Sequence, residues 1–402
     1  APDRAAFFNG ALSRYLDFMD SYLAPGETCH PSDNLGAVLA AAEMRGAGGA
    51  EFLAALAVAY QVQARLSDVA PVRDRGFDHT TQGAYAAAAG VAKALGLPAG
   101  QIANAIAISG TANNALRVTR TGALSQWKGL AYPNTAMAAT HAALLAAHGI
   151  TGPAEVFEGN KGFKETIAGP FDIEWGKEDL ERVRLTIVKK HNAEIHAQSA
   201  IEAALDIRAR GGVLAGRIAA VRLNTFDVAH RIIGGGEEGD KRVVRTKEEA
   251  DHSLPYMLAV ALIDGEVEPA QYAPERIAAA DVQALLRKVE ITPDDALSAQ
   301  FPRRMPAELE VMLAGGEVMR AHRDDYRGFH TRPFDWSAAR EKFDRLAGPF
   351  TTASERDALA DAVATLDERP VAHLAALLGG VRAPLQTPAL APSSLPIPEN
   401  AR

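Results

Sequence analysis

The chain has 402 residues, 48% of them hydrophobic and only 6% aromatic, and its formal net charge is −8. This length predicts two domains, and the absence of a basic block excludes a nucleic-acid groove and a membrane-surface patch. No apolar run reaches the roughly 20 residues of a membrane span and no signal peptide opens the chain, so we expect a cytoplasmic protein.

Residues 1 to about 180 are predicted to form helix after helix. Apolar residues recur at helical spacing in four alanine-rich segments, which cover residues 50–68, 80–96, 99–117 and 134–149. Threonines precede the second of these segments, and glycine ends the second and the fourth, as expected at helix termini. Small residues on several faces allow the helices to approach closely, which favours a compact all-helical bundle.

The pattern changes near residue 180. Alternating apolar residues predict strands at 182–188 and 217–226, and a hairpin at 307–321 with its turn at Gly315-Gly316. Helices are expected between them at 199–210 and 252–265. This combination is typical of an α+β domain of about 150 residues.

Helical patterns return at 335–348 and 354–368. We therefore predict a mostly α protein in which residues 1–180 and 330–402 form a helical bundle domain. A smaller α+β domain, residues 181–329, is inserted into it. Residues 383–402 are rich in proline and are expected to be extended or mobile.

The stretch 14–36 concentrates titratable residues. If the first helix continues through Met19, then Asp17, Asp20 and Ser21 share one face. Two carboxylates on one face repel, which raises the pKa of one of them and suits acid–base chemistry. Pro25-Gly26 would break the helix, so that His30 can fold back over that face. The alternative is that the aspartates are solvated and the polar residues that follow cap a helix.

A second cluster, at 116–129, contains the cations Arg117, Arg120 and Lys128. Because arginine offers a bidentate fork, the cluster indicates a site for carboxylates. A solvated basic loop is the alternative.

Three further segments join polar residues to the start of a helix. They contain Arg75, Asp78 and His79; Lys189, Lys190, Glu194 and His196; and Asp251, His252 and Tyr256. Capping or core packing would explain each of them. In the third segment, His252 and Tyr256 are spaced to share a helical face.

The single cysteine, Cys29, excludes an intramolecular disulfide, an iron–sulfur cluster and a thiolate zinc site. There is no H-E-x-x-H motif, and the spacing of His191 and His196 fits no standard ligand pair. We therefore expect no metal.

Together these segments resemble the MmgE/PrpD family. The resemblance rests on "NGALSRYLDFMD…HPSDNLGAVLAAAE", "GAYAAAAGVAKALGL", "AEIHAQSAIEAAL" and "ADHSLPYMLAVALIDG", which occur in the family's order and spacing. It implies a helical domain with a smaller α+β lid, a cofactor-free active site between them, and a homodimer. The family includes 2-methylcitrate dehydratases, cis-aconitate decarboxylases and iminodisuccinate epimerases.

The family's first motif is matched by Asp17, Ser21 and His30, and Asp20 stands at a position that is often acidic in the family. Lys128 aligns with a lysine that contacts the substrate in the family. Tyr256 aligns with the family's lid tyrosine. Met19 and Glu194 depart from many members; Glu194 replaces the histidine of the decarboxylases. The run 193–199 resembles the 2-methylcitrate dehydratases, which favours dehydration over decarboxylation or epimerisation. A non-catalytic carboxylate-binding protein is the alternative from another class, although pure binding does not need a carboxylate beside a histidine.

The resulting hypothesis is dehydration of 2-methylcitrate, a small tricarboxylate, without a metal or cofactor. Asp17 or His30 would take the carbon-bound proton, and the other, or Tyr256, would protonate the departing hydroxyl group. Asp20 would support this chemistry, and Lys128 would stabilise the developing negative charge. The expected substrate-binding residues are Ser21, His79, Arg117, Arg120, Lys189, Glu194 and His196.

Overall fold

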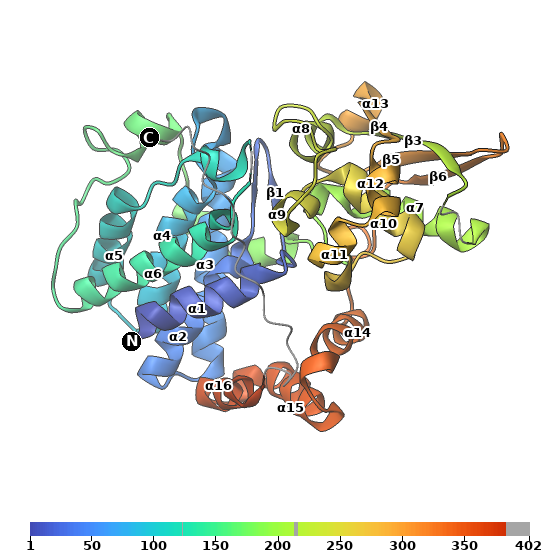
Figure 1. Cartoon of the computed structure of the whole chain (residues 1–402). Coiled ribbons are helices and arrows are strands. Elements are labelled where there is room, and N and C mark those ends of the chain that lie inside the picture. Colours follow the sequence, from blue (N-terminus) through green and yellow to red (C-terminus); the bar gives the residue numbers. More distant parts are fainter. Residues whose placement is uncertain (123, 213–215, 383–402) are drawn as a thin grey trace, which may run out of the picture.

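The structure is a computed structural model that describes residues 1–122, 124–212 and 216–382. The chain is mostly helical and has one small mixed sheet in its C-terminal region, as predicted (Figure 1). The prediction for residues 383–402 concerns residues outside the described ranges. Within those ranges, every helix is too short or too polar to cross a bilayer.

Six helices form the N-terminal half (Figure 1): α1 Pro2–Tyr15, α2 Leu35–Arg45, α3 Gly49–Val69, α4 Thr80–Ala94, α5 Ala99–Ala112 and α6 Trp127–Ala147. Their shared core consists largely of alanine. Small side chains let the backbones lie close together. At Gly83, for example, a Cβ atom would lie 2.4 Å from the ring of Tyr132, so α4 and α6 can adopt this distance only with glycine there.

The prediction that the first helix continues through Met19 is wrong. Helix α1 ends at Tyr15, and residues 22–29 form a hairpin of β1 Tyr22–Ala24 and β2 Glu27–Cys29. Pro25-Gly26 is the turn of this hairpin, where Gly26 has φ +80°, a conformation that glycine adopts without steric cost. Asp17 and Asp20 therefore do not share a helical face.

The strand predicted at 182–188 is also wrong. Residues Glu181–Leu185 form a short 3-10 helix, and the only pairing in this segment is an isolated bridge between Ile187 and Ser21. Val183 is 40% exposed and Leu185 53% exposed. The alternation of apolar residues therefore does not mark a buried sheet face here.

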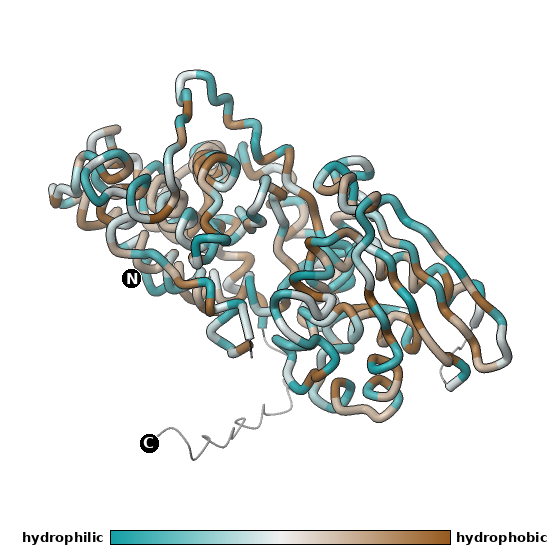
Figure 2. The backbone as a smooth tube through the Cα atoms, turned by 90° about the horizontal axis from the view of Figure 1, so that it is seen from above, coloured by the Kyte–Doolittle hydropathy of each residue, from teal (hydrophilic) through white to brown (hydrophobic). Residues whose placement is uncertain are grey.

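The other strand predictions are confirmed by β3 Ile218–Thr225 and by the hairpin of β5 Ala307–Leu313 and β6 Val318–Arg323. Strand β4 Val289–Pro293 was not predicted, and its residues are mostly partly buried or exposed. The strand order is β4-β3-β5-β6, with β3 parallel to β4 and antiparallel to β5. Hydrophobic and hydrophilic stretches alternate along these strands in Figure 2.

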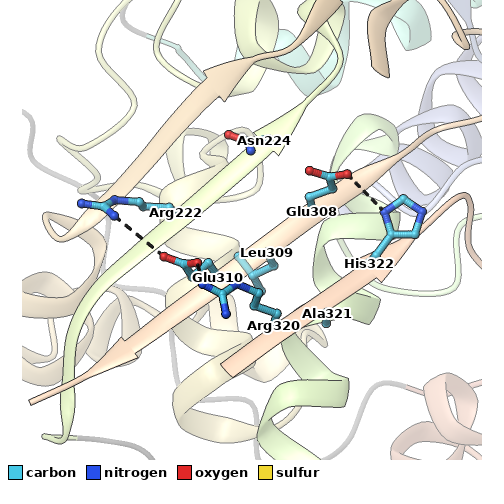
Figure 3. A pocket seen from close by; sticks show the side chains of 8 residues that line it. All are labelled: Arg222, Asn224, Glu308, Leu309, Glu310, Arg320, Ala321 and His322. Atoms are coloured by element: carbon cyan, nitrogen blue, oxygen red, sulfur yellow. Dashed lines mark ion pairs between the residues drawn. The ribbon is translucent and has the colours of Figure 1, made fainter. Parts of the chain in front are cut away.

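The buried side of the sheet packs against helices, which include α7 Gln198–Gly211, α10 Leu254–Asp264 and α12 Ala280–Leu286. Shorter helices complete this half: α8 Asp227–Ile233, α9 Lys247–Ala250, α11 Pro274–Ile277 and α13 Asp295–Ser298. The opposite side carries charged residues, among which Arg222 and Glu310 form an ion pair, as do Glu308 and His322 (Figure 3). We interpret this side as a solvated sheet face.

Three helices end the described chain: α14 Trp336–Ala347, α15 Ala353–Ala364 and α16 Val371–Gly380. Leu359 of α15 and Val371 of α16 are buried in the alanine-rich core of the N-terminal helices. The chain thus returns to its first half after the sheet. The exact division into an outer helical domain and an inserted domain stays a prediction.

Candidate active site

Asp17 lies where α1 ends and the chain changes direction. Its φ is 55°, a left-handed conformation that aspartate tolerates better than most residues, and its N–H donates to the carbonyl of Arg14 at 2.9 Å. The residue is 6% exposed. The end of the helix therefore brings a buried carboxylate to the boundary with the second half of the chain.

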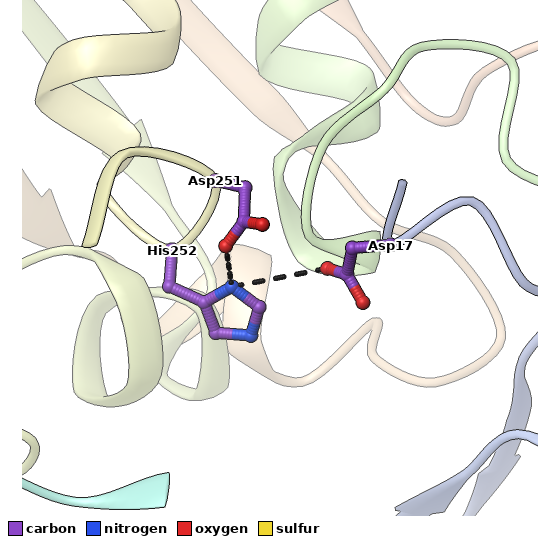
Figure 4. Close-up of side chains that lie close together, drawn as sticks. All are labelled: Asp17, Asp251 and His252. Atoms are coloured by element: carbon purple, nitrogen blue, oxygen red, sulfur yellow. Dashed lines mark hydrogen bonds and ion pairs between the residues drawn. The ribbon is translucent and has the colours of Figure 1, made fainter. Parts of the chain in front are cut away.

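Asp251 and His252 approach Asp17 from the turn between α9 and α10 (Figure 4). Nδ1 of His252 lies 2.7 Å from Oδ1 of Asp251 and 3.8 Å from Oδ2 of Asp17. Lys128, in the first turn of α6, places Nζ 3.0 Å from Oδ1 of Asp251 and 2.8 Å from Nδ1 of His252. We call Asp17, Lys128, Asp251 and His252 the Asp17 cluster.

Two more lysines neutralise the carboxylates of the Asp17 cluster. Lys189, 1% exposed, donates to the carbonyl of Asp17 at 2.6 Å and lies 3.4 Å from its Oδ2. Lys247 donates to Oδ2 of Asp251 at 2.7 Å. Three ammonium groups therefore face two carboxylates, which leaves the surroundings attractive to an anion.

The charges decide the protonation states in this cluster. Burial alone would raise the pKa of Asp17, but Lys189 and Lys128 hold it well below its usual value. The pKa of Asp251 is likewise lowered against the effect of burial, chiefly by Lys128 and Lys247. Burial lowers the pKa values of Lys128 and His252. Nζ of Lys128 and Nδ1 of His252 are in hydrogen-bond contact, so a proton can pass between them.

Donor atoms of Asp17, Asp251 and His252 lie within 4.8 Å of one another, a spacing that could suit a metal ion. However, Lys128 contacts both Asp251 and His252, and Lys189 contacts Asp17. The ammonium groups therefore already supply the positive charge that a divalent ion would bring. These residues do not fit a metal site well, and the expectation of a metal-free site stays a prediction.

A cavity of about 230 Å³ opens beside the cluster. Asp17, Lys128, Lys247 and Asp251 are among the residues that line it, with Arg14 at the end of α1. A small anion can therefore reach the lysines from this side.

His30 follows the β1–β2 hairpin and returns toward the end of α1, as expected from the sequence. Its Nδ1 lies 2.7 Å from the carbonyl of Asp20 and 3.2 Å from Oγ of Ser21. Because a carbonyl only accepts, Nδ1 carries the proton and Nε2 keeps its lone pair. Burial and the nearby Arg14 hold the pKa of His30 well below its usual value. His30 is therefore an unprotonated imidazole at neutral pH.

Asp20 holds the start of the next helical turn, because its Oδ1 accepts a hydrogen bond from the N–H of Ser32 at 3.0 Å. Its pKa is raised, but burial is the main cause, with a smaller contribution from Asp33. The predicted repulsion between Asp17 and Asp20 is not the reason for the shift. Ser21 and His30 do meet, as predicted.

His79 lies next to His30, and both arginines approach Asp78, which precedes His79 in the chain. The rings of His79 and His30 are 5.3 Å apart. Arg120, predicted to bind substrate, instead donates to Oδ2 of Asp78 through Nε at 2.5 Å. Arg117 is paired with Glu238 at 2.5 Å. Neither arginine is thus a free carboxylate ligand in this conformation.

Glu194 and His196 form a pair of their own, with Oε1 of Glu194 2.7 Å from Nδ1 of His196. Tyr256 is fully buried in the C-terminal core, and its hydroxyl donates to the carbonyl of Gln271. Helix α10 begins at Leu254, so the prediction that His252 and Tyr256 share a helical face is wrong. The structure does not bring Tyr256 to the Asp17 cluster.

Asp251, His252 and Lys247 were not among the predicted site residues, although Asp251 and His252 belong to one of the polar segments that precede a helix. The available signal was the composition of the segment 247–252, which places four charged residues and a histidine before a strongly apolar helix. A strongly apolar helix is buried in the core. Polar residues that directly precede such a helix therefore lie where the core ends, either at a domain surface or in a functional site.

Two family models together match most of the chain. Residues 1–176 match the MmgE/PrpD N-terminal domain and residues 191–368 match the MmgE/PrpD C-terminal domain. The cluster draws Asp17 and Lys128 from the first match and Asp251 and His252 from the second.

Individual relatives carry dehydratase names. A 2-methylcitrate dehydratase of Cupriavidus necator is 32% identical over 345 residues, which cover 79% of this chain and 69% of that protein. A 2-methylcitrate dehydratase of Salmonella typhimurium is 31% identical over 322 residues, which cover 75% of this chain and 64% of the relative. A fungal alkylcitrate dehydratase is 29% identical over 382 residues, covering 86% and 73%. The chain thus spans about two thirds of the length of these relatives.

Proposed function

Because the chain belongs to the MmgE/PrpD family, we propose that it is a hydro-lyase that dehydrates a 2-hydroxy tricarboxylate, and that 2-methylcitrate is its substrate. The observation that carries the proposal is the Asp17 cluster, in which two buried carboxylates from the two halves of the chain lie beside His252 and are held by Lys128 and by the neighbouring Lys189 and Lys247. The names of the relatives at about 30% identity support the same reaction.

The lysines are suited to the substrate. A tricarboxylate carries three negative charges, and Lys128 and Lys247 line a cavity that a small anion can enter. As a proton leaves the carbon next to a carboxylate, negative charge builds up on that carboxylate. Ammonium groups held in a buried site stabilise this charge more strongly than water does.

His30 is the better of the two proposed bases. Its pKa is lowered, so it is unprotonated at neutral pH, and Nε2 is free to accept a proton. Asp17 is a weaker base, because Lys189 and Lys128 hold its pKa well below the usual value. In this assignment Asp17 positions the lysines, and His30 takes the carbon-bound proton.

The departing hydroxyl group needs a proton of its own. Lys128 and His252 are 2.8 Å apart and can hold one between them. Transfer of this proton to the hydroxyl oxygen breaks the carbon–oxygen bond and releases water, while the electrons of the broken carbon–hydrogen bond form the alkene. Tyr256, which the resemblance had suggested for this step, is too deeply buried to contribute directly.

In this proposal the α+β region 181–329 acts as a lid that brings Asp251 and His252 to the helical domain. We further propose a homodimer. Phe8, Leu12 and Tyr15 of α1 are about 60% exposed in this single chain and offer an apolar surface for a second copy. Sedimentation equilibrium tests the dimer independently of the activity.

A substrate panel tests the reaction. Purified protein is mixed separately with 2-methylcitrate, citrate, cis-aconitate and iminodisuccinate. Alkene formation is followed by ultraviolet absorbance, decarboxylation by release of carbon dioxide, and epimerisation by chiral chromatography. The proposal predicts alkene formation from 2-methylcitrate at the highest kcat/KM of the panel. Carbon dioxide release from cis-aconitate, or epimerisation alone, would replace dehydration by one of the other family reactions.

A further inference from the structure

Glu238 is a buried carboxylate that two arginines hold. Its side chain is 3% exposed, and Oε1 lies 2.5 Å from Arg117 and 3.3 Å from Arg73. Both arginines belong to the N-terminal half, in the segments after α3 and α5, whereas Glu238 lies between α8 and α9 of the C-terminal half. The contact therefore joins the two halves through one carboxylate.

The segment that carries Glu238 is rich in glycine. It reads Gly-Gly-Gly-Glu-Glu-Gly from residue 234 to 239, and Glu238 is its one buried residue. Gly235 and Gly239, on either side of Glu238, have φ values of +103° and +92°. Glycine at both ends gives the segment backbone freedom that other residues lack. Glu238 can therefore leave the arginines without unfolding a helix or strand.

Arg117 is connected to the proposed base His30 through Asp78 and His79. Arg117 is 3.9 Å from Oδ2 of Asp78, and Oδ1 of Asp78 is 3.3 Å from His79, whose ring is 5.3 Å from that of His30. A carboxylate held by Arg73 and Arg117 would thus lie on the His30 side of the site, away from the lysines of the Asp17 cluster.

A third cation, Lys241, interacts electrostatically with the carboxylate of Glu238. Lys241 is 7% exposed, and among the described residues no carboxylate lies within ion-pair distance of its ammonium group. Glu238 and Glu194 are the acidic groups that act most strongly on it, and burial lowers its pKa. Glu194 in turn interacts with His252 and Lys189 of the site. A buried lysine without an ion-pair partner is a ready ligand for an incoming carboxylate.

We propose that Arg73, Arg117 and Lys241 form a second carboxylate subsite, that Glu238 occupies it when no substrate is bound, and that a substrate carboxylate displaces Glu238. This proposal rests on the proposed function, since it assigns one carboxylate of a di- or tricarboxylate to the arginines and leaves another to the lysines. Glu238 is then a competitor of the substrate and determines its affinity.

The competition between Glu238 and a substrate carboxylate changes the apparent dissociation constant of the substrate. When the binding-competent form is only a fraction of the population, the apparent dissociation constant rises by the inverse of that fraction. If Glu238 fills the subsite in about nine molecules of ten, its removal tightens binding about tenfold. Replacing Glu238 by glutamine keeps the shape of the side chain and removes the charge that the arginines prefer.

The matched control is the neighbouring glutamate. Glu237 is exposed and forms its ion pair with Arg231 of α8, while Arg73 and Arg117 act on it only through longer-range electrostatics. Glu237→Gln changes the net charge of the same segment by the same amount. Citrate is the probe, and isothermal titration calorimetry measures its dissociation constant for the wild type, Glu238→Gln and Glu237→Gln. We expect about tenfold tighter binding for Glu238→Gln alone. Equal affinities of the two variants, or weaker binding by Glu238→Gln, would overturn the proposal.

A second measurement uses the wild-type protein and does not depend on how the variant folds. A glutamate-specific protease cuts after exposed glutamates. Cleavage after the exposed Glu237 serves as an internal reference. Cleavage after Glu238, which is buried in the free protein, reports that its side chain has left the arginines. Mass spectrometry identifies the bond cut. Citrate should raise the ratio of cleavage after Glu238 to cleavage after Glu237, and an unchanged ratio would contradict displacement.

These results separate the subsite from the reaction. If citrate displaces Glu238 but the substrate panel yields no alkene, the subsite stands and the proposed function fails. If 2-methylcitrate is dehydrated but the two glutamine variants bind alike, the function stands and the subsite fails.

Discussion

Replacing Asp251 by asparagine is the sharpest structural perturbation of the Asp17 cluster. Asp251 is fully buried and accepts from Lys128 at 3.0 Å and from Lys247 at 2.7 Å, and its Oδ1 lies 2.7 Å from His252. Asparagine has the same shape but no charge. The variant therefore leaves two lysines beside a neutral amide without creating a cavity.

The expected loss of stability follows from this burial. Removing one partner of a buried ion pair costs about 3–5 kcal/mol, because the remaining charge stays buried without compensation. The pKa of Asp251 is lowered in the folded protein, so its stabilising effect is complete above the unfolded-state value of about 4 and is lost as the pH falls below that value. The difference between wild type and variant should shrink on the acid side.

Urea denaturation followed by circular dichroism measures the free energy of unfolding, at pH 7 and again near pH 3. Asp367→Asn, at an exposed position of the short 3-10 helix Leu366–Glu368, is the matched control and should change the free energy little. If Asp251→Asn destabilises the protein no more than Asp367→Asn at pH 7, the ion pairs of the cluster do not contribute as the structure indicates. A loss of equal size at both pH values would contradict the electrostatic explanation.

The catalytic assignment yields further predictions. His30→Gln should lower kcat about 10²- to 10⁴-fold, whereas His141→Gln, on an exposed face of α6, should not. Lys128→Met should lower kcat more than it changes KM, because Lys128 acts on the transition state. The acid limb of kcat/KM should lie below the ordinary histidine pKa of about 6.5, since the pKa of His30 is lowered; a limb at higher pH would contradict His30 as the base. Dialysis against EDTA should leave the rate unchanged, and a loss restored by one metal would show a metal-dependent site.

Much of the fold could be predicted from the sequence because the patterns were long. The alanine-rich helices up to Ala147 repeat their apolar residues over three or more turns, and β5 alternates buried and exposed residues along its length. The failures lie where the pattern is short. The segment 182–188 alternates over only a few residues, and in the described part of the chain no neighbouring strand buries Val183 or Leu185.

In the first helix, one residue ends the helix although the periodic pattern of apolar residues continues beyond it. Phe8, Leu12 and Tyr15 fit a helical stripe, yet all three are about 60% exposed in this chain. The left-handed conformation of Asp17 then ends the helix. Aspartate permits but does not require that conformation, so the sequence contained no decisive signal for the break.

The candidate site was predicted in part. His30, Ser21 and Lys128 were selected from local sequence, and the structure gives each a polar partner in the proposed site. Pairing could not be predicted, because it depends on which segments meet. Arg120 joins Asp78, more than forty residues away in the chain, and Arg117 joins Glu238 from the other half. The apolar context of Tyr256 indicated a core residue, and its resemblance to a family position outweighed that indication.

The most direct test of the central claim follows the substrate's hydroxyl oxygen. 2-Methylcitrate is incubated with the protein in water enriched in heavy oxygen, and mass spectrometry measures the label in the remaining substrate. Reversible dehydration at the Asp17 cluster and His30 predicts that the alkene forms and that the hydroxyl oxygen exchanges with solvent, and that His30→Gln loses both. Neither alkene nor exchange with the wild-type protein, or undiminished exchange with His30→Gln, would contradict the account.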